Sequence, residues 1–256
     1  MFAEGAIERI DAVAFENNQP GPWGSFEGLL TSERFRQLNE TFPPLSVFEK
    51  HTGIPRYHGQ RSHNRWYLAL EHSIYDNNVP GTQGCVSLQQ LDPAWQEFIS
   101  ALRDSHSYNR MIRRLLGEDQ YVVRFAWHVA GSGCDVSPHL DDPLKAGTHI
   151  FYFNTSDSWK EEWGGQTLFL IDPKVEEMNP EIGDFEQVVQ APIVDNKSML
   201  FRNTSLAWHG VATINCEEGH YRRLFNVIFQ LPVRPDAQYG AVRRLASRTR
   251  RVLIGR

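Results

Sequence analysis

The chain has 256 residues, of which 41% are hydrophobic and 12% aromatic, and its formal net charge is −5. This composition is typical of a globular protein with a sizeable core and excludes a disordered chain. No apolar run reaches the roughly 18 residues that a membrane span needs, and the first residues carry acids where a secretory signal would be basic, so we expect a cytoplasmic protein. The cysteines, Cys85, Cys134 and Cys216, form no CxxC pair, so we expect reduced thiols.

Residues 1–120 have the pattern of helices and loops. The stretch TSERFRQLNETF begins with a Thr31/Ser32 cap, and DPAWQEFISALRDSHSYNRMIRRLLG begins with Asp92 as cap and Pro93 in the first turn. Apolar residues recur in the second stretch at intervals of three and four. This second stretch therefore predicts two amphipathic helices, separated by a break near Ser105, that cover one face of a sheet.

From Tyr121 the pattern changes to short β-rich runs separated by Gly, Pro, Asn and Asp. The predicted strands are YVVRFAWHVA, THIFYFN, GQTLFLI, FEQVVQAPIV, SMLFRN, HGVATI and RRLFNVIFQLPV. Because no helical pattern separates them, they favour an antiparallel sandwich or jelly roll over a parallel α/β sheet. We find no repeat or linker, so 1–256 is predicted to be one domain with its β core at 121–232.

The C-terminal segment 240–256, GAVRRLASRTRRVLIGR, holds six arginines and no acid. The favoured interpretation is a helix that docks on the body through its apolar residues while the arginines face water or acids of the body. The alternative is contact with an anionic partner, such as a phosphorylated substrate, a carrier protein or a membrane surface. We expect neither a nucleic-acid partner nor a membrane span, and the oligomeric state is left open.

A candidate metal site starts at the turn SPHLDDPLKAG, where His139 and Asp141 stand two residues apart. A third ligand is available downstream in SLAWHGVATI, where His209 lies in a strand-like setting and is followed by a glycine. Two imidazoles and one carboxylate form the ligand set that suits non-haem Fe(II), because three coordination positions remain for a bidentate cosubstrate and dioxygen.

Residues 121–230 resemble the Fe(II)- and 2-oxoglutarate-dependent dioxygenase superfamily, and most of all its prolyl-hydroxylase-related branch. The resemblance rests on RFAWHVAGSG, PHLDDP, HIFYFN, EWGGQTLFL, SMLFRNTSLAWHGV and YRRLFNVIFQL, in this order. It implies a double-stranded β-helix, or jelly roll, mainly β with helical cover, and His139, Asp141 and His209 as iron ligands. Residues 1–120 match no family that we can name.

The resemblance also implies a cation on the last strand that binds the distal carboxylate of 2-oxoglutarate. Arg222 and Arg223 stand 13 and 14 residues beyond His209, and only one can face the interior because side chains alternate along a strand. With Arg223 inward, Phe225, Val227 and Phe229 share its face. Alignment on the closing strand of the family favours Arg223 as the cosubstrate-binding residue, with Arg222 as the alternative.

Other residues compete for roles at this site. His149 lies on the strand after the turn and would be a ligand only if the strand register differs. His128, on the strand before the turn, contacts cosubstrate or substrate, or else is a packed core histidine. Asp142 is an alternative to Asp141 that the HxD spacing disfavours, and Trp163 with the two following glycines is expected to shape a tight turn.

The sequence thus predicts an enzyme that hydroxylates an unactivated C–H bond of a small molecule, using Fe(II), 2-oxoglutarate and dioxygen and releasing succinate and CO2. Three alternatives remain: a protein hydroxylase of the prolyl type, a halogenase or desaturase on the same scaffold, and a non-catalytic, cupin-like metal-binding protein. The carboxylate of Asp141 disfavours halogenation, because halogenating members of the superfamily have Gly or Ala at that position.

Overall fold

The structure of the protein is a computed structural model, and it describes residues 1–53, 60–72, 83–117 and 120–232. The basic segment predicted at 240–256 lies outside these residues. The helices are α1 Ala12–Asn17, α2 Ser32–Glu40, α3 Pro93–Asp104 and α4 His106–Leu116. The strands are β1 Trp23–Glu27, β2 Glu49–His51, β3 Arg65–Leu70, β4 Cys85–Val86, β5 Val122–Ala130, β6 Val136–His139, β7 Lys145–Tyr152, β8 Thr167–Pro173, β9 Phe185–Ala191, β10 Lys197–Arg202, β11 His209–Val211 and β12 Arg222–Gln230.

The helices begin where capping side chains stand in the sequence. The hydroxyl of Thr31 accepts a hydrogen bond from the first turn of α2, and the carboxylate of Asp92 does the same for α3. Ser105 ends α3 and caps α4, which then stops at Gly117 in the left-handed conformation. The predicted break between two amphipathic helices near Ser105 is confirmed.

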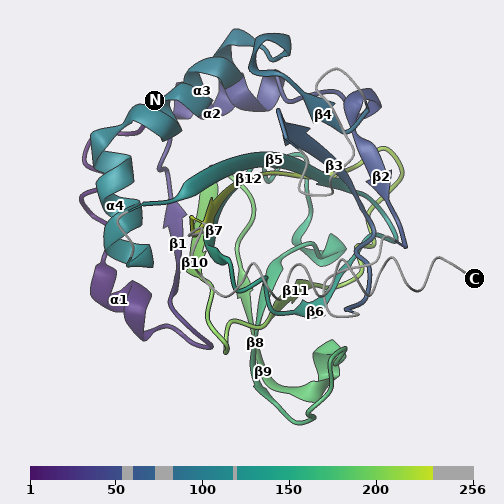
Figure 1. The fold of residues 1–256 in the computed structure, drawn as a ribbon. Helices are drawn as coiled ribbons and strands as arrows, with labels where there is room; N and C mark the ends of the chain where they lie inside the picture. Colours follow the sequence, from purple (N-terminus) through teal and green to yellow (C-terminus); the bar gives the residue numbers. More distant parts are fainter. Residues whose placement is uncertain (54–59, 73–82, 118–119, 233–256) are drawn as a thin grey trace, which may run out of the picture.

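The described strands form two sheets that face each other (Figure 1). The large sheet has eight strands in the order β1-β10-β7-β12-β5-β3-β2, with β4 paired in parallel to β3. The small sheet has four strands in the order β6-β11-β8-β9. Apart from β4 the neighbouring strands are antiparallel. A mainly β, two-sheet architecture is what the sequence predicted.

The first 120 residues contribute more strand than the sequence analysis expected. β1 extends the large sheet by pairing with β10, and β3 extends its other side by pairing with β5. The prediction of mainly helices and loops for this part did not include these strands. Both strands reach the sheet through contacts with residues far away in the chain, which local sequence patterns do not report.

The two faces of the large sheet carry different cores. On the outer face, aromatic residues of β5 and β12 such as Trp127 and Phe225 pack against Trp95 and Phe98 of α3. The helices lie over this face in Figure 1. Alternate residues, such as Leu224, point to the inner face and join the core shared with the small sheet. The inner face is therefore the one from which side chains can reach a site between the sheets.

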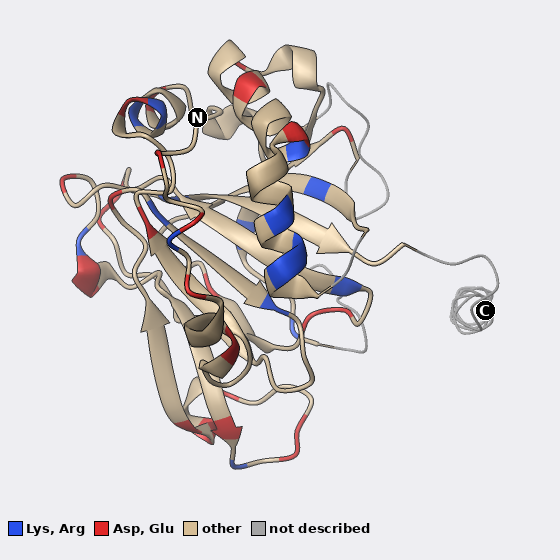
Figure 2. Cartoon of the chain, turned by 90° about the vertical axis from the view of Figure 1, so that its left-hand side faces the viewer, with Lys and Arg blue, Asp and Glu red and all other residues tan. Residues whose placement is uncertain are grey.

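Charged side chains gather on the helices and loops, and the strands are largely free of them (Figure 2). None of the described helices has the length and apolar character that a bilayer crossing requires. Cys85, Cys134 and Cys216 are buried free thiols, as the sequence predicted.

The centre of the outer core offers a stability test. The Trp95 side chain is fully buried and its ring contacts Phe98, Trp127 and Phe225. We expect Trp95→Ala to lower the free energy of unfolding by about 3–5 kcal/mol, because it leaves a large cavity. Leu206→Ala, at a side chain that is 62% exposed, should change it by less than about 0.5 kcal/mol. Urea unfolding of both variants measures the difference, and equal losses would contradict this account of the core.

Candidate metal centre

The candidate site is built on the pairing of β6 with β11. In this antiparallel pair His139 and His209 are direct partners in register, and their ring centroids lie 4.2 Å apart. Partners in an antiparallel pair project their side chains from the same face. Asp141, two residues beyond the end of β6, completes a group in which one potential ligand atom of each residue lies within 4.8 Å of the others. The structure therefore brings together the three residues that the sequence analysis selected.

Gly210 permits the close approach of these two strands. A Cβ atom at this position would lie 2.8 Å from the carbonyl oxygen of Val136 and 3.3 Å from the nitrogen of Pro138. Because both atoms belong to the backbone of β6, a side chain would push the strands apart. The glycine after His209 is therefore the residue that allows the backbones of β6 and β11 to approach closely.

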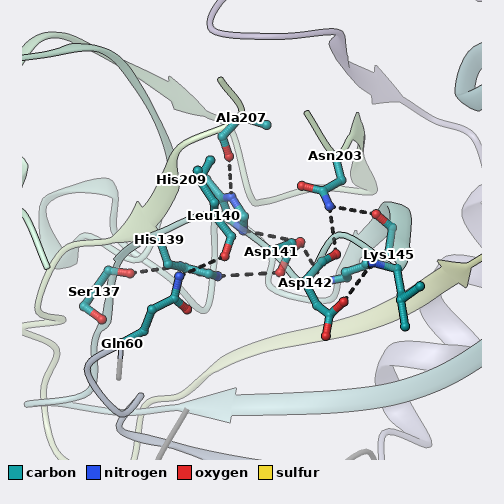
Figure 3. Close-up of polar contacts among 11 residues, drawn as sticks. Gln60, Ser137, His139, Leu140, Asp141, Asp142, Lys145, Asn203, Ala207 and His209 are labelled. Carbon is teal, nitrogen blue, oxygen red and sulfur yellow. Dashed lines mark hydrogen bonds and ion pairs between the residues drawn. The ribbon is translucent and has the colours of Figure 1, made fainter. Parts of the chain in front are cut away.

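Backbone carbonyls fix the orientation of both imidazoles. Nδ1 of His139 lies 2.9 Å from the carbonyl oxygen of Ser137, and Nδ1 of His209 lies 2.9 Å from that of Ala207 (Figure 3). Because a carbonyl can only accept, each Nδ1 must donate its proton, and Nε2 is the lone-pair nitrogen of the neutral ring. Both Nε2 atoms point to Asp141, at 3.7 Å and 3.8 Å from its carboxylate oxygens.

Lys145 holds the third group of the site in its charged form. Its ammonium lies 2.8 Å from Oδ2 of Asp141. Burial would raise the pKa of the Asp141 carboxyl, but Lys145 and the two histidines outweigh burial and lower that pKa below its ordinary value. Asp141 is therefore a carboxylate at neutral pH. The sequence analysis missed Lys145, although it stands four residues after Asp141.

Asp142 shapes the turn and does not face the site. Its Oδ1 accepts a hydrogen bond of 2.8 Å from the backbone N–H of Leu144, as turn-forming aspartates do. The amide of Asn203 donates to the carbonyls of Asp142 and Lys145, at 2.9 Å and 2.8 Å, and so ties the turn to the chain after β10 (Figure 3). Of the two aspartates, Asp141 is the one that lies in the group with His139 and His209.

A buried arginine lies on the inner face of the large sheet, and it is Arg222. Its guanidinium donates a 3.1 Å hydrogen bond to Oγ1 of Thr167 and stands over the ring of Tyr152, 5.5 Å from the ring centroid. The side chain of Arg222 is 5% exposed, and no hydrogen-bond acceptor for its Nε lies among the described residues. Burial lowers the pKa of this guanidinium to about 10, so it stays protonated at neutral pH.

The expected inward orientation of Arg223 is wrong. Its guanidinium points to the helical layer, where Nη2 donates to Oδ1 of Asn39 at 2.6 Å and Cζ stands 5.4 Å from the ring centroid of Phe42. Phe225 and Val227 share this outer face. Both faces of β12 are buried and apolar, so alternation alone could not tell which arginine points inward.

Gly165 provides room for the buried arginine. It has a φ of +85°, and a Cβ atom there would lie 3.0 Å from Cδ of Arg222 and 3.2 Å from the ring of Trp159. The sequence analysis treated the glycine pair at 164–165 as a turn only. The pair forms the turn and also leaves space for Arg222.

His149 is not part of the site. It faces the helices, where its Nδ1 lies 2.9 Å from the hydroxyl of Tyr108 and its ring is fully buried. Burial lowers the pKa of this imidazole to about 3, so it is neutral. His149 therefore lies away from the group of His139, Asp141 and His209, in agreement with the sequence analysis, which did not favour it as a ligand.

His63 lies beside the site and was missed. Its ring centroid is 4.8 Å from that of His139, and the amide of Gln60 donates to the carbonyl of Leu140 at 3.2 Å. Arg61 forms an ion pair with Glu181. Residues 60–64 therefore run across the site, from β3 to the connection between β8 and β9. No sequence signal could identify His63, because it stands 76 positions before its neighbour.

Comparison with solved structures identifies the fold. A prolyl-4-hydroxylase from Pseudomonas putida matches 89% of this chain and 100% of its own at 16% identity, with a TM-score of 0.54. The non-haem α-ketoglutarate-dependent carbocyclase SnoK of nogalamycin biosynthesis matches 93% of this chain and 92% of its own at 14% identity, with a TM-score of 0.56. The chain shares the fold of these enzymes.

A third solved structure extends this comparison to an enzyme with a peptide bound. A prolyl hydroxylase from Trichoplax adhaerens, in complex with a hypoxia-inducible-factor peptide, matches 86% of each chain at 15% identity, with a TM-score of 0.53. No family model matches the sequence, and no curated protein matches it significantly. The fold implied by the sequence resemblance is therefore confirmed by structure alone.

The role of Gly210 can be tested through metal binding. We expect Gly210→Ala to weaken binding of Mn(II), used as a redox-stable probe, by at least about tenfold, because separation of β6 from β11 moves His209 away from His139. The control is Gly183→Ala, where an added Cβ meets nothing within 4 Å. Equilibrium dialysis gives both affinities, and an unchanged affinity in Gly210→Ala would contradict the proposed strand constraint.

Proposed function

We propose that the protein is an Fe(II)- and 2-oxoglutarate-dependent oxygenase that hydroxylates a C–H bond of a small molecule. The observation that carries this proposal is the group of His139, Asp141 and His209, in which the Nε2 atoms of two imidazoles and an ionised carboxylate converge. This donor set suits a divalent iron with open positions. When bound, iron and 2-oxoglutarate would supply the oxidising power, with succinate and CO2 as coproducts.

The protein's own residues would hold these groups and orient them. His139 and His209 keep the required tautomer because each Nδ1 proton is committed to a carbonyl. Lys145 keeps Asp141 ionised and restricts its rotation. The contacts of residues 60–64 across the site would limit access of water, and they favour a small substrate over a folded protein.

Arg222 is the residue that we propose to bind the distal carboxylate of 2-oxoglutarate. A buried guanidinium needs an anion, and no carboxylate of the described residues forms an ion pair with Arg222. Its unpartnered Nε and the nearby hydroxyls of Thr167 and Tyr152 could together bind two carboxylate oxygens. This proposal replaces the role that the sequence analysis gave to Arg223.

Asp141 also supports hydroxylation over halogenation, because its carboxylate would take the metal position that a halide needs. A peptide substrate, as in the Trichoplax structure, is the second outcome to test. A non-catalytic metal-binding protein is disfavoured by Arg222, since a buried cation between the sheets has little purpose without an acidic ligand. Iron-dependent conversion of 2-oxoglutarate to succinate distinguishes the enzymatic functions from this last one.

The metal site can be tested by removing its histidines one at a time. We expect His139→Ala and His209→Ala to lose Fe(II) binding and succinate formation while their melting temperatures stay close to that of the unmodified protein. His149→Ala is the matched control, since it removes a buried imidazole from the other face of the sheet. It should retain iron. Full activity in either ligand variant would reject the site.

The two neighbouring arginines provide a second, internally controlled test. We expect Arg222→Leu to raise the 2-oxoglutarate concentration needed for half-maximal activity by at least about tenfold, since a charge-assisted contact contributes on the order of 1.5–3 kcal/mol. Arg223→Leu should have less than about a threefold effect, because this side chain faces α2. Steady-state kinetics with varied 2-oxoglutarate provides the comparison. The reverse ranking would reject Arg222 as the cosubstrate-binding residue.

A further inference from the structure

His128 is a buried polar side chain that the proposed mechanism does not use. It lies on β5, is 4% exposed, and neither of its ring nitrogens has a hydrogen-bond partner in the part of the chain that the structure describes. Its ring contacts Tyr67 of β3 edge to face, at 5.3 Å between centroids. A buried imidazole without partners costs free energy, so a ligand that offers a hydrogen bond would be bound favourably there.

Arg65 lies next to His128 on the same face of the large sheet. In the register of β3 with β5, Tyr67 is paired with His128 and Trp66 with Val129, so one further residue brings Arg65 opposite Ala130. Arg65 is therefore the diagonal neighbour of His128, a relation that places side chains roughly 7–8 Å apart. It is partly buried and forms no ion pair among the described residues.

Arg222 flanks the same position from the other side. It is paired with Ala130 in the register of β12 with β5. Arg65 and Arg222 thus stand on the two strands that flank β5, about 10 Å apart at the backbone, with Ala130 between them in the register. Two arginines and a histidine, grouped around a small residue, form a basic cluster on the inner face.

The charged groups that shift the pKa of His128 are all basic. Burial lowers the pKa of its imidazole well below the ordinary value, and Arg65, Arg222, Lys145 and His51 lower it further. Neutral His128 can then donate one hydrogen bond to an acidic group. If a divalent metal and the doubly charged 2-oxoglutarate are bound, the charges of Asp141, Lys145 and the two arginines still leave a local excess of two positive charges. The cosubstrate alone does not neutralise this basic cluster.

The basic cluster lies near the candidate metal centre. Asn64, which precedes Arg65, pairs with Asp135, directly before β6, and its amide donates to the carbonyl of Gly133 at 3.0 Å. One residue earlier, His63 contacts His139. Arg65 therefore lies on the side of the site where residues 60–64 cross it, and Arg222 with Thr167 lies on the far side.

We propose that the substrate carries an acidic group, a carboxylate or a phosphate, that binds between Arg65 and His128 while its reacting carbon faces the metal. This inference rests on the proposed function and assigns a different anion to each arginine: 2-oxoglutarate to Arg222 and the substrate to Arg65. The guanidinium supplies the charge-assisted contact, and His128 donates the second hydrogen bond. The metal centre itself is not part of this binding site.

The test uses the protein loaded with Mn(II) and saturating 2-oxoglutarate, so that Arg222 is occupied and no turnover takes place. Acetate, inorganic phosphate and neutral acetamide are titrated at constant ionic strength, followed by calorimetry and by the shift in melting temperature. We expect acetate or phosphate to bind saturably and acetamide not to bind. The preferred anion distinguishes a carboxylate substrate from a phosphorylated one.

Variants then locate the bound anion. Arg65→Gln should weaken anion binding at least tenfold and change 2-oxoglutarate affinity less than twofold, and His128→Phe should weaken anion binding by a smaller factor. Arg124→Gln is the matched control, because Arg124 stands on the same face of β5, six residues from Ala130, and should leave anion binding unchanged. If Arg65→Gln folds poorly, Arg65→Lys keeps the charge but not the forked geometry, and should give an intermediate loss.

Three results would overturn the inference. The first is that the protein binds neither anion while 2-oxoglutarate is bound, the second is that the anion displaces 2-oxoglutarate, and the third is that Arg65→Gln loses affinity for 2-oxoglutarate. Failure of the unmodified protein to bind Mn(II) and 2-oxoglutarate would appear before any anion is added, and it would overturn the proposed function as well. The two failures are therefore distinguishable.

Discussion

The antiparallel pairing of β6 with β11 is the constraint on which the candidate site depends. It makes His139 and His209 direct partners, and the distance between the two strands is possible because residue 210 has no side chain. Once the strands are paired, the imidazoles are oriented by backbone carbonyls two residues before each histidine. The site therefore arises from backbone geometry, and only Asp141 depends on the conformation of a turn.

That turn is held by contacts from other parts of the chain. Asn203 binds two of its carbonyls, and the side chain of Asp142 binds its own backbone. Lys145 then offers a cation to Asp141. A carboxylate that is buried, ionised and fixed is expensive to form without such support. The fold provides this support before any ligand is present, which reduces the cost of binding a metal.

The large sheet separates structural from functional side chains by its two faces. The outer face is covered by helices and carries aromatic residues, and there Nδ1 of His149 and the guanidinium of Arg223 make hydrogen bonds within the protein. The inner face carries His128 and Arg222, whose ring nitrogens and Nε, respectively, have no hydrogen-bond partner among the described residues. Unpartnered buried atoms also occur on the outer face, at Nε2 of His149, so it is the position of His128 and Arg222 between the sheets that makes them candidates to contact a ligand.

Much of the fold could be predicted from the sequence, because its signals are local. Caps and apolar spacing located α3 and α4, and turn residues separated the strands from β5 onwards. β3 was missed because an added strand gains its stability from a distant partner, although RWYLAL is apolar and aromatic enough to have suggested it.

The site was only partly predictable for the same reason. His139, Asp141 and His209 stand out through motif spacing, whereas the choice between Arg222 and Arg223 required knowledge of which face of β12 points inward. Both faces of β12 are largely apolar. Asn226, which lies on the inner face between Leu224 and Ile228, is the one polar residue of this stretch that could have indicated the inward face. His63 contacts the site only through tertiary structure, and Arg65 comes near it only through the pairing of β3 with β5.

The most direct measurement is an anomalous difference map at the iron edge, from crystals soaked anaerobically with Fe(II) and 2-oxoglutarate. Our account predicts one peak bonded to Nε2 of His139, Nε2 of His209 and the carboxylate of Asp141, with 2-oxoglutarate extending from the iron to Arg222. A peak at other residues, or no peak with these three side chains ordered, would contradict it.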